Sequence, residues 1–285
     1  MRGVALFPAL FVLLWSTGFI AAKYGLPYAP PFAFLAWRMV LVTGLMAVVA
    51  VAMRATWPRT LVEYRDLAIV AVLVHALYLG GVFVAIDGGM AAGTSAMLVG
   101  LQPILTVLLA WMWMGERVVA RQWAGLAVGL LGVFFVVRHK IDFAGDLHGL
   151  LPCAIALVGI SVGTLYQKRR CAHIDLRTGA VVQYAVCAVL FVPLALLFDT
   201  RSVQWTGSFI FALGWSVLVL SVGAIGLLYV LLRHGAAANV ARLFYLVPPV
   251  TALEAYLLFG EKLDALALIG MALIALGVVL ARGRS

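Results

Sequence analysis

Apolar residues in this chain form long, nearly continuous runs, with little of the alternation typical of half-buried strands. Charged residues, prolines and glycines divide the sequence into ten apolar segments, near residues 4–23, 32–53, 67–86, 91–114, 120–137, 148–167, 178–198, 208–232, 236–259 and 264–281. Each is close to the about twenty residues that an α-helix needs to cross a bilayer. The pattern predicts an all-α membrane protein with ten transmembrane helices and short connections.

Composition also indicates a polytopic membrane protein. Of the 285 residues, 65% are hydrophobic and 11% are charged, whereas soluble domains have about 25% charged residues. The basic residues behind the net charge of +9 form no face that could follow phosphates, so we expect no nucleic-acid partner. The N-terminal apolar run is longer than the core of a cleaved signal, which indicates a retained first helix.

Residues with catalytic or metal-binding potential are sparse. The three cysteines, Cys153, Cys171 and Cys187, lack the spacing of a metal site, and the five histidines are scattered. The sequence has no nucleotide-binding fingerprint, which argues against direct use of ATP. We therefore expect no enzyme activity, no metal and no cofactor.

Lysine and arginine residues in the connections predict the orientation in the membrane. With a cytoplasmic N-terminus, thirteen of them lie on the cytoplasmic side and five on the other side. The bias predicts a multi-pass protein of a bacterial-type inner membrane, surrounded by lipid, with both termini in the cytoplasm.

The sequence repeats itself at a constant offset of 145 residues. Between residues 92 and 133, sixteen of forty-two ungapped positions match the residue 145 positions later, where shared composition would give about one in ten. Pro103 meets Pro248 at this offset, and Ser16 meets Ser161. The repeat predicts two five-helix halves, residues 1–142 and 143–285.

An odd number of spans in each half makes the second half inverted relative to the first. Two inverted repeats around a central cavity are typical of secondary transporters, which bind substrate near the midplane. We therefore predict alternating-access transport of a small-molecule substrate. A channel-like facilitator, or a membrane enzyme or receptor on the same fold, is the alternative. Proton coupling, and a monomeric or homodimeric state, stay open.

Four stretches resemble a known family: LFVLLWSTGFIAAKYG, FLAWRMVLV, GLQPILTVLLAWMWMGER and LFYLVPPVTALEAYLLFGEK. They are similar to the paired modules of the EamA-type branch of the drug/metabolite transporter superfamily, above all in the Pro…Gly-Glu-basic pattern of both halves. The resemblance covers essentially all ten spans. It implies a ten-helix basket with a central cavity and, as in many relatives, export of small metabolites or amino acids.

The first helix departs from the small four-helix exporters of that superfamily, which carry a carboxylate there. This chain has Trp15, Ser16 and Thr17 in the first helix, and the sixth helix has no acid either. The proton-for-cation mechanism of those exporters therefore cannot be transferred.

Prolines interrupt the fourth and ninth spans at equivalent places, Pro103 and Pro248. Each should free a backbone carbonyl, which for Pro248 is that of Phe244. Open backbone at membrane depth persists only where protein or a water-filled cavity satisfies it. The prolines either shape packing or, with the neighbouring Gln102 and Tyr245, belong to the substrate pathway.

Glu254 is a lone carboxylate within the ninth span, and Arg38 lies at a similar depth in the second. Because the two side chains lie at a similar depth in the membrane, Glu254 and Arg38 could form a structural ion pair. Alternatively, Glu254 holds a cationic substrate group or a coupling proton. Arg242, near the cytoplasmic side, either snorkels to the interface or forms an inner gate.

Further polar side chains within the spans are candidates for the substrate pathway. His75 is the only histidine deep in a span, and it acts either as a structural imidazole or in a proton relay. The others either join helices or line a cavity for amphipathic solutes: Trp15, Tyr78, Tyr166, Gln183 and Tyr229. Glycines between 125 and 132 and between 270 and 277 predict close helix packing.

Overall fold

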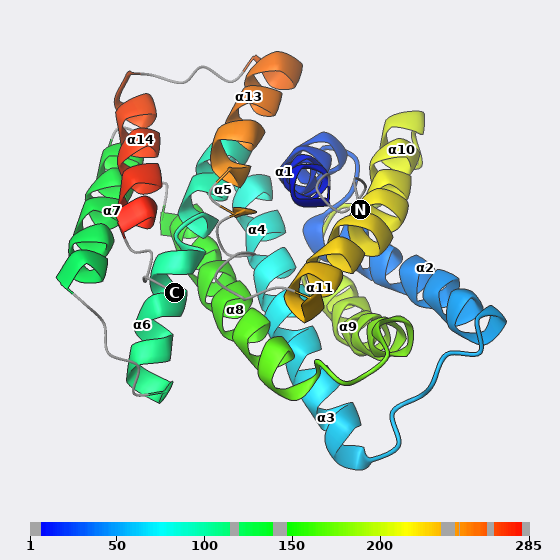
Figure 1. Cartoon of the computed structure of the whole chain (residues 1–285). Coiled ribbons are helices and arrows are strands. Elements are labelled where there is room, and N and C mark those ends of the chain that lie inside the picture. The colour runs from blue at the N-terminus through cyan, green and yellow to red at the C-terminus, as the bar shows by residue number, and fades with distance from the viewer. Residues whose placement is uncertain are drawn as a thin grey trace.

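The computed structural model describes residues 7–114, 120–138, 147–234, 243–244, 246–260 and 265–280. Within these ranges the chain is helical and contains no strand (Figure 1). Its helical elements, in chain order, are α1 (Phe7–Gly25), α2 (Pro31–Ala52), α3 (Leu61–Val70), the π-helical η2 (Ala71–Leu77), α4 (Tyr78–Asp87), α5 (Ala92–Val99), α6 (Gln102–Met114), α7 (Ala120–Arg138), α8 (Leu147–Arg170), α9 (Leu176–Phe198), α10 (Gly207–Trp215), the π-helical η3 (Ser216–Ala224), α11 (Ile225–His234), α13 (Val247–Phe259) and α14 (Ala265–Leu280).

Several helical stretches have the length and apolar character of transmembrane spans. Six such stretches occur in the described part of the chain: Phe7–Gly25, Pro31–Ala52, Leu61–Asp87, Gly149–Arg170, Leu176–Phe198 and Gly207–Leu231. They confirm the all-α membrane class. The other predicted spans coincide with shorter helices or run into residues outside the described ranges, so the ten-helix arrangement in two repeats stays a prediction.

Two helix boundaries differ from the prediction. The third span begins at Leu61 and not at residue 67, because Thr60 and Glu63 form a capping box. In this box the Glu63 N–H donates to Thr60 Oγ1 at 3.2 Å, and the Glu63 carboxylate accepts from the Thr60 N–H at 3.0 Å. The fourth predicted span divides into α5 and α6, which separate at Gly100.

Glycine faces bring two helices together, as the sequence predicts. Figure 1 shows α7 and α14 side by side at one edge of the molecule. A Cβ atom on Gly132 would lie 2.7 Å from backbone atoms of Gly270 and Ile274, and one on Gly277 would lie 2.5 Å from the carbonyl oxygen of Gly125. Because no carbon atom fits at these distances, only glycine allows the two backbones to approach so closely.

Gly277→Ala is expected to destabilise the protein, whereas Gly44→Ala is expected to stabilise it. A methyl group at Gly277 would overlap the backbone of α7, and overpacking costs about 1–3 kcal/mol. A methyl group at Gly44 of α2 would meet no atom within 4 Å, and alanine is favoured over glycine in helices by about 0.8–1 kcal/mol. The unfolding midpoints of the two purified variants check this difference in sign; equal shifts would contradict the close packing.

Candidate functional site

A small cavity lies among α1, α2, η2, α4, η3 and α11. Its lining consists of Trp15, Gly18, Phe19, Arg38, Val74, Tyr78, Leu79, Val82, Phe83, Leu220, Ala224 and Ile225. The cavity has a volume of about 30 Å³, and one water needs about 10–15 Å³ of such space. This space has room for about two waters and is too small for a metabolite.

Aromatic rings form one wall of the cavity. The ring planes of Trp15 and Tyr78 are 11° apart, and their centroids are separated by 6.1 Å. Phe244 packs edge-on against Trp15, with 5.1 Å between the ring centroids. All three side chains are buried. The wall therefore has a defined shape and offers mainly apolar surface to a solute.

Arg38 supplies the charge of the cavity. It is 2% exposed, and its Nε donates a hydrogen bond to Ser221 Oγ at 3.0 Å. The hydroxyl of Tyr184 donates to the carbonyl oxygen of Ser221 at 2.7 Å, which holds that partner in place. A guanidinium stays charged in proteins, and no carboxylate in the described ranges lies within ion-pair distance of Arg38.

Two π-helical segments bring polar partners to this region. η2 carries His75, and η3 carries Ser221. A π-turn alters the direction of the side chains that follow, and such turns are frequent at functional sites. η2 starts at residue 71 and η3 at residue 216, which is the 145-residue offset of the sequence repeat.

A buried hydrogen-bonded hub adjoins the cavity and is centred on Gln183 of α9. Its Oε1 accepts from the Tyr229 hydroxyl at 2.7 Å and lies 3.1 Å from His75 Nε2, while its Nε2 donates to Gln167 Oε1 at 3.1 Å. Because Gln183 Oε1 is an acceptor, we assign the imidazole proton to Nε2. His75 Nδ1 is then a buried acceptor without a partner among the described residues.

The cavity and the hub make corresponding contacts. Gln183 follows Arg38 by 145 residues. Arg38 of α2 contacts Ser221 in η3, and Gln183 of α9 contacts His75 in η2. Equivalent positions of the two halves thus each reach the π-helical segment of the other half.

Both prolines lie in the first turn of a helix, Pro103 in α6 and Pro248 in α13. A proline there removes no helical hydrogen bond, so each proline begins a helix after a break. The carbonyl of Phe244, predicted to be free, accepts from the Val247 N–H at 3.3 Å. The two breaks also face each other, because a Cβ atom on Gly100 would lie 2.5 Å from Pro248 Cγ.

Gln102 connects the first of these breaks to α8. Its Nε2 donates to Thr164 Oγ1 at 3.3 Å, and its Oε1 is buried without a partner among the described residues. Tyr245, which the sequence places beside the second break, lies outside the described residues.

Glu254 contacts α1 and makes no ion pair with Arg38. Its Oε1 accepts from Ser16 Oγ at 2.9 Å, and its Oε2 is buried without a partner in the described part of the chain. Since Arg38 donates to Ser221, the ion pair considered from the sequence is absent between these two residues. Arg242 lies outside the described residues.

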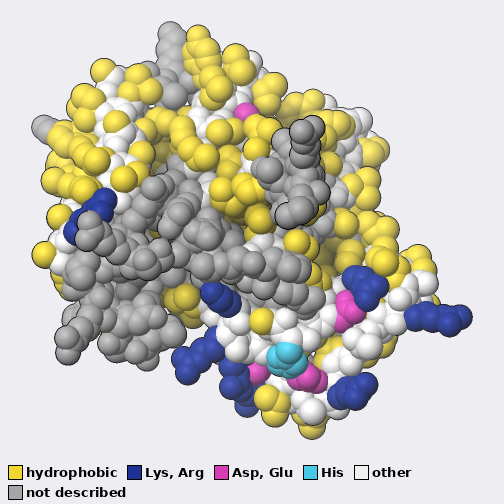
Figure 2. Space-filling model, in the orientation of Figure 1, with side chains coloured by type: hydrophobic (Ala, Val, Ile, Leu, Met, Phe, Trp, Pro, Cys, Tyr) yellow, Lys and Arg dark blue, Asp and Glu magenta, His cyan; other side chains and the backbone are white. Residues whose placement is uncertain are grey.

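The connection after α2 and the adjoining ends of α3, α8 and α9 carry most of the visible charge, and we name this part the basic end. Figure 2 shows lysine and arginine side chains gathered there, below a largely apolar body. The basic end contains Arg54, Arg59, Arg65, Lys168, Arg169, Arg170 and Arg177.

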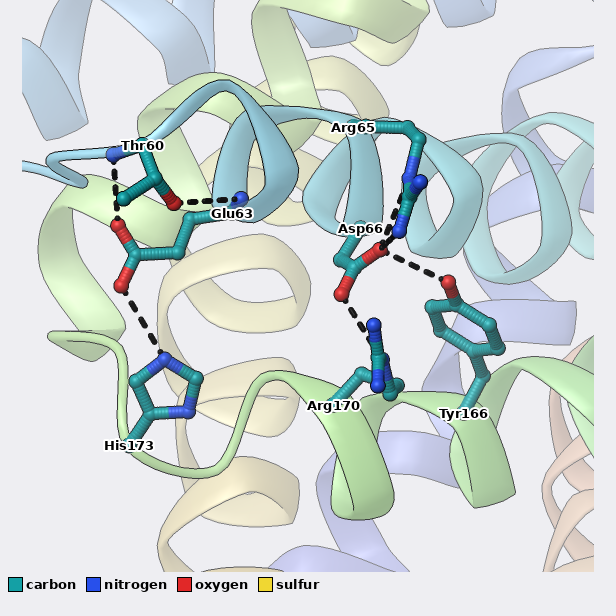
Figure 3. Close-up of polar contacts among 7 residues, drawn as sticks. All are labelled: Thr60, Glu63, Arg65, Asp66, Tyr166, Arg170 and His173. Atoms are coloured by element: carbon teal, nitrogen blue, oxygen red, sulfur yellow. Dashed lines mark hydrogen bonds and ion pairs between the residues drawn. The ribbon is translucent and has the colours of Figure 1, made fainter.

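A buried carboxylate joins α3 to α8 at the basic end (Figure 3). Asp66, whose side chain is 4% exposed, accepts from Arg65 Nη2 at 2.9 Å, from the Tyr166 hydroxyl at 2.9 Å and from Arg170 Nε at 3.0 Å. Beside it, Glu63 Oε1 lies 3.2 Å from a ring nitrogen of His173. Tyr166, predicted for the substrate pathway, therefore contacts this ionic cluster.

Contacts between the two halves also occur at the opposite end. The carboxylate of Asp199 accepts from the backbone N–H of Ala33 at 2.6 Å and so caps α2, whose own N-cap residue, Pro30, offers no side-chain acceptor. Burial raises the pKa of the Asp199 carboxyl above its usual value. Arg201 pairs with Asp87 nearby.

The structure distributes the predicted site residues over four places. Trp15, Arg38 and Tyr78 line the cavity; His75, Gln183 and Tyr229 form the hub; Gln102, Pro103, Pro248 and Glu254 lie on α6 and α13; and Tyr166 lies at the basic end. Sequence reasoning missed Ser221, Gln167 and Asp66. The 145-residue offset could have indicated Ser221, because it relates Ser221 to Ala76, the neighbour of the predicted His75.

Apolar spanning helices around a cavity with a buried arginine are the arrangement expected of a membrane transport protein. The model of the EamA-like transporter family matches residues 1–138 and 147–283. The chain belongs to the EamA-like transporter family.

Relatives and a solved structure resemble the chain over nearly its whole length. The uncharacterized transporter YvbV of Bacillus subtilis is 27% identical, over 99% of this chain and 92% of that protein. A probable terminal-alkyne amino-acid exporter of Streptantibioticus cattleyicolor is 29% identical, over 97% and 92%. A protein of known crystal structure has the same fold, with a TM-score of 0.71 at 21% identity, over 99% of this chain and 96% of that one.

Proposed function

We propose that this EamA-family transporter exports small organic metabolites, amino acids and amphipathic compounds among them, by alternating access. The observation that carries the proposal is the central cavity, where a buried arginine and an aromatic wall meet between helices from both halves of the chain. A relative named as a probable amino-acid exporter supports this range of substrates.

The proposed architecture has ten transmembrane helices in two inverted repeats, residues 1–142 and 143–285. Three observations support it: the 145-residue repeat in the sequence, the same offset between η2 and η3, and the matching contacts of Arg38 and Gln183. In such a pair of repeats, an exchange of conformations between the halves opens a central site to each side in turn.

The proposed orientation places the basic end in the cytoplasm of a bacterial-type inner membrane, because cytoplasmic loops carry an excess of lysine and arginine. The Asp66 cluster then closes the cytoplasmic side between α3 and α8, and the contacts of Asp199 and Arg201 close the outer side. Export requires these two sets of contacts to open alternately.

Reconstitution of the purified chain in liposomes tests the proposal. A carrier shows saturable uptake that is accelerated by the same solute on the opposite side, whereas a channel shows conductance without saturation. The panel contains neutral, cationic and anionic amphipathic solutes. Failure of every solute to exchange above empty liposomes would contradict the transport function.

Glu254→Gln is expected to lower proton-gradient-driven transport by about tenfold or more, since we assign the coupling proton to this carboxylate. Glutamine retains an acceptor for Ser16 but cannot release a proton. Transport driven by a pH gradient and solute exchange without a gradient are measured side by side. Exchange should persist in the variant; unchanged gradient-driven transport would contradict the assignment, and Ser16→Ala, which leaves the carboxylate in place, is the control.

A further inference from the structure

We infer that Arg38 binds the carboxylate of the transported solute, so that the cavity selects small monocarboxylates with an apolar or aromatic body over zwitterions and amines. The inference rests on the proposed transport function and narrows its substrate class. Three observations carry it. Arg38 has no counter-ion among the described residues, its terminal N–H groups donate to no described residue, and the remaining described lining is apolar or aromatic.

Arg38 is a buried cation without a protein counter-ion in the described part of the chain. Ionisable side chains within membrane spans usually pair with one another or face a pathway. Glu254, which the sequence places at a similar depth, accepts a hydrogen bond from Ser16 of α1. No carboxylate of the described residues balances the charge of Arg38, and the cavity adjoins Arg38, so a solute that enters the cavity can supply the compensating negative charge.

The hydrogen bonds of Arg38 leave one face of the guanidinium open. Nε is occupied by Ser221, and the two terminal nitrogens make no hydrogen bond to any described residue. Guanidinium groups bind carboxylates through two parallel N–H donors, and the two terminal nitrogens form such a pair. The contact with Ser221 orients the group without using this pair.

Among the described residues, the rest of the lining is apolar or aromatic and contains no acidic side chain. The body of the solute would contact Trp15, Phe19, Tyr78 and Phe83, whose rings favour an apolar or aromatic group. An ammonium group on the solute would find no carboxylate and would lie near the positive charge of Arg38. A zwitterion should therefore bind less tightly than the corresponding acid, and an amine should bind least.

The cavity is smaller than such a solute. A volume of about 30 Å³ corresponds to about two waters, so binding requires the lining helices to move apart. The alternating-access cycle supplies this opening.

Binding of three probes of nearly equal size tests the charge preference without any mutation: 3-phenylpropanoate, phenylalanine and 2-phenylethylamine. The full-length protein is purified in detergent, and affinities are measured by calorimetry and by quenching of tryptophan fluorescence. Loss of a hydrogen-bonded ion pair weakens binding by about tenfold or more, so the acid should bind at least that much more tightly than the amine. Equal or tighter binding of the amine, or no binding of the acid, overturns the inference.

Arg38→Gln should weaken binding of 3-phenylpropanoate by about tenfold or more and leave binding of 2-phenylethylamine unchanged. Arg38→Lys, which retains the charge but not the planar fork, should give an intermediate loss. Arg59→Gln, which removes an exposed arginine at the basic end, is the matched control and should have no effect. A folded Arg38→Gln protein that retains full affinity for the acid overturns the inference.

Solute exchange in liposomes separates this inference from the proposed function. Exchange of neutral or cationic solutes, but not of the acid, would preserve the transport function and overturn the role of Arg38. Binding of the acid that depends on Arg38, without exchange of any solute, would support the binding site and contradict the transport function.

Discussion

Gln183→Leu is expected to lower the free energy of unfolding by about 2–5 kcal/mol, because the substitution removes three hydrogen bonds that are each worth about 0.6–1.7 kcal/mol within a membrane. Leucine fills a similar volume but leaves the polar atoms of His75, Gln167 and Tyr229 without their present partner. Reversible unfolding of the purified variant in detergent measures the loss.

The matched control for this prediction is Tyr229→Phe, which removes only the bond from the Tyr229 hydroxyl to Gln183. It should cost about 0.6–1.7 kcal/mol. A Gln183→Leu protein no less stable than Tyr229→Phe would show that Gln183 does not hold the hub together. Because the hub adjoins η2, transport should fall in parallel with stability for Gln183→Leu.

Asp66→Asn should loosen the basic end and lower the free energy of unfolding by about 2–3 kcal/mol. The change removes the charge that accepts from Arg170 and Tyr166, and it places an N–H₂ group among donors. Arg65 and Arg170 are about half exposed, with exposed side-chain fractions of 59% and 46%, so most of the effect should come from the partly buried bond to Tyr166.

Hydrogen–deuterium exchange locates this effect. Faster exchange is expected in α3 and in the last turns of α8, since Asp66 is their shared contact. Asp175→Asn is the control, because the Asp175 carboxylate bonds to Arg177 and to the backbone of Thr56, and neither residue belongs to α3 or α8. If α3 and α8 exchange at the same rate in both variants as in the unmodified protein, Asp66 does not hold the basic end closed.

Predictions from the sequence succeeded for features that depend on many residues, such as long apolar runs and repeated glycines. The apolar runs located the six long spans of the described part of the chain, and the boundaries of α2 and α9 lie within two residues of those expected. The glycine spacing predicted close helix packing, and these glycines lie where α7 packs on α14. Each inference rests on a periodic or repeated feature, and a single misjudged residue does not alter it.

Predictions for individual polar groups succeeded less well. Glu254 and Arg38 lie at similar depths, yet depth along two helices does not specify rotation about their axes, and the two side chains have different partners. Asp66 looked like a loop residue because it precedes the apolar run. The capping box of Thr60 and Glu63 extends the helix toward the chain's N-terminus and brings Asp66 beside α8.

Composition, charge bias and internal repetition were sufficient for the class of the protein, because these properties persist in the order of residues whatever the fold. The contacts within the cavity and the hub could be identified only from the tertiary structure. Arg38 and Ser221 are separated by 183 positions, and His75 and Gln183 by 108. Such pairs depend on how the helices pack and on the direction that the two π-helical segments give to their side chains, and no local pattern encodes either.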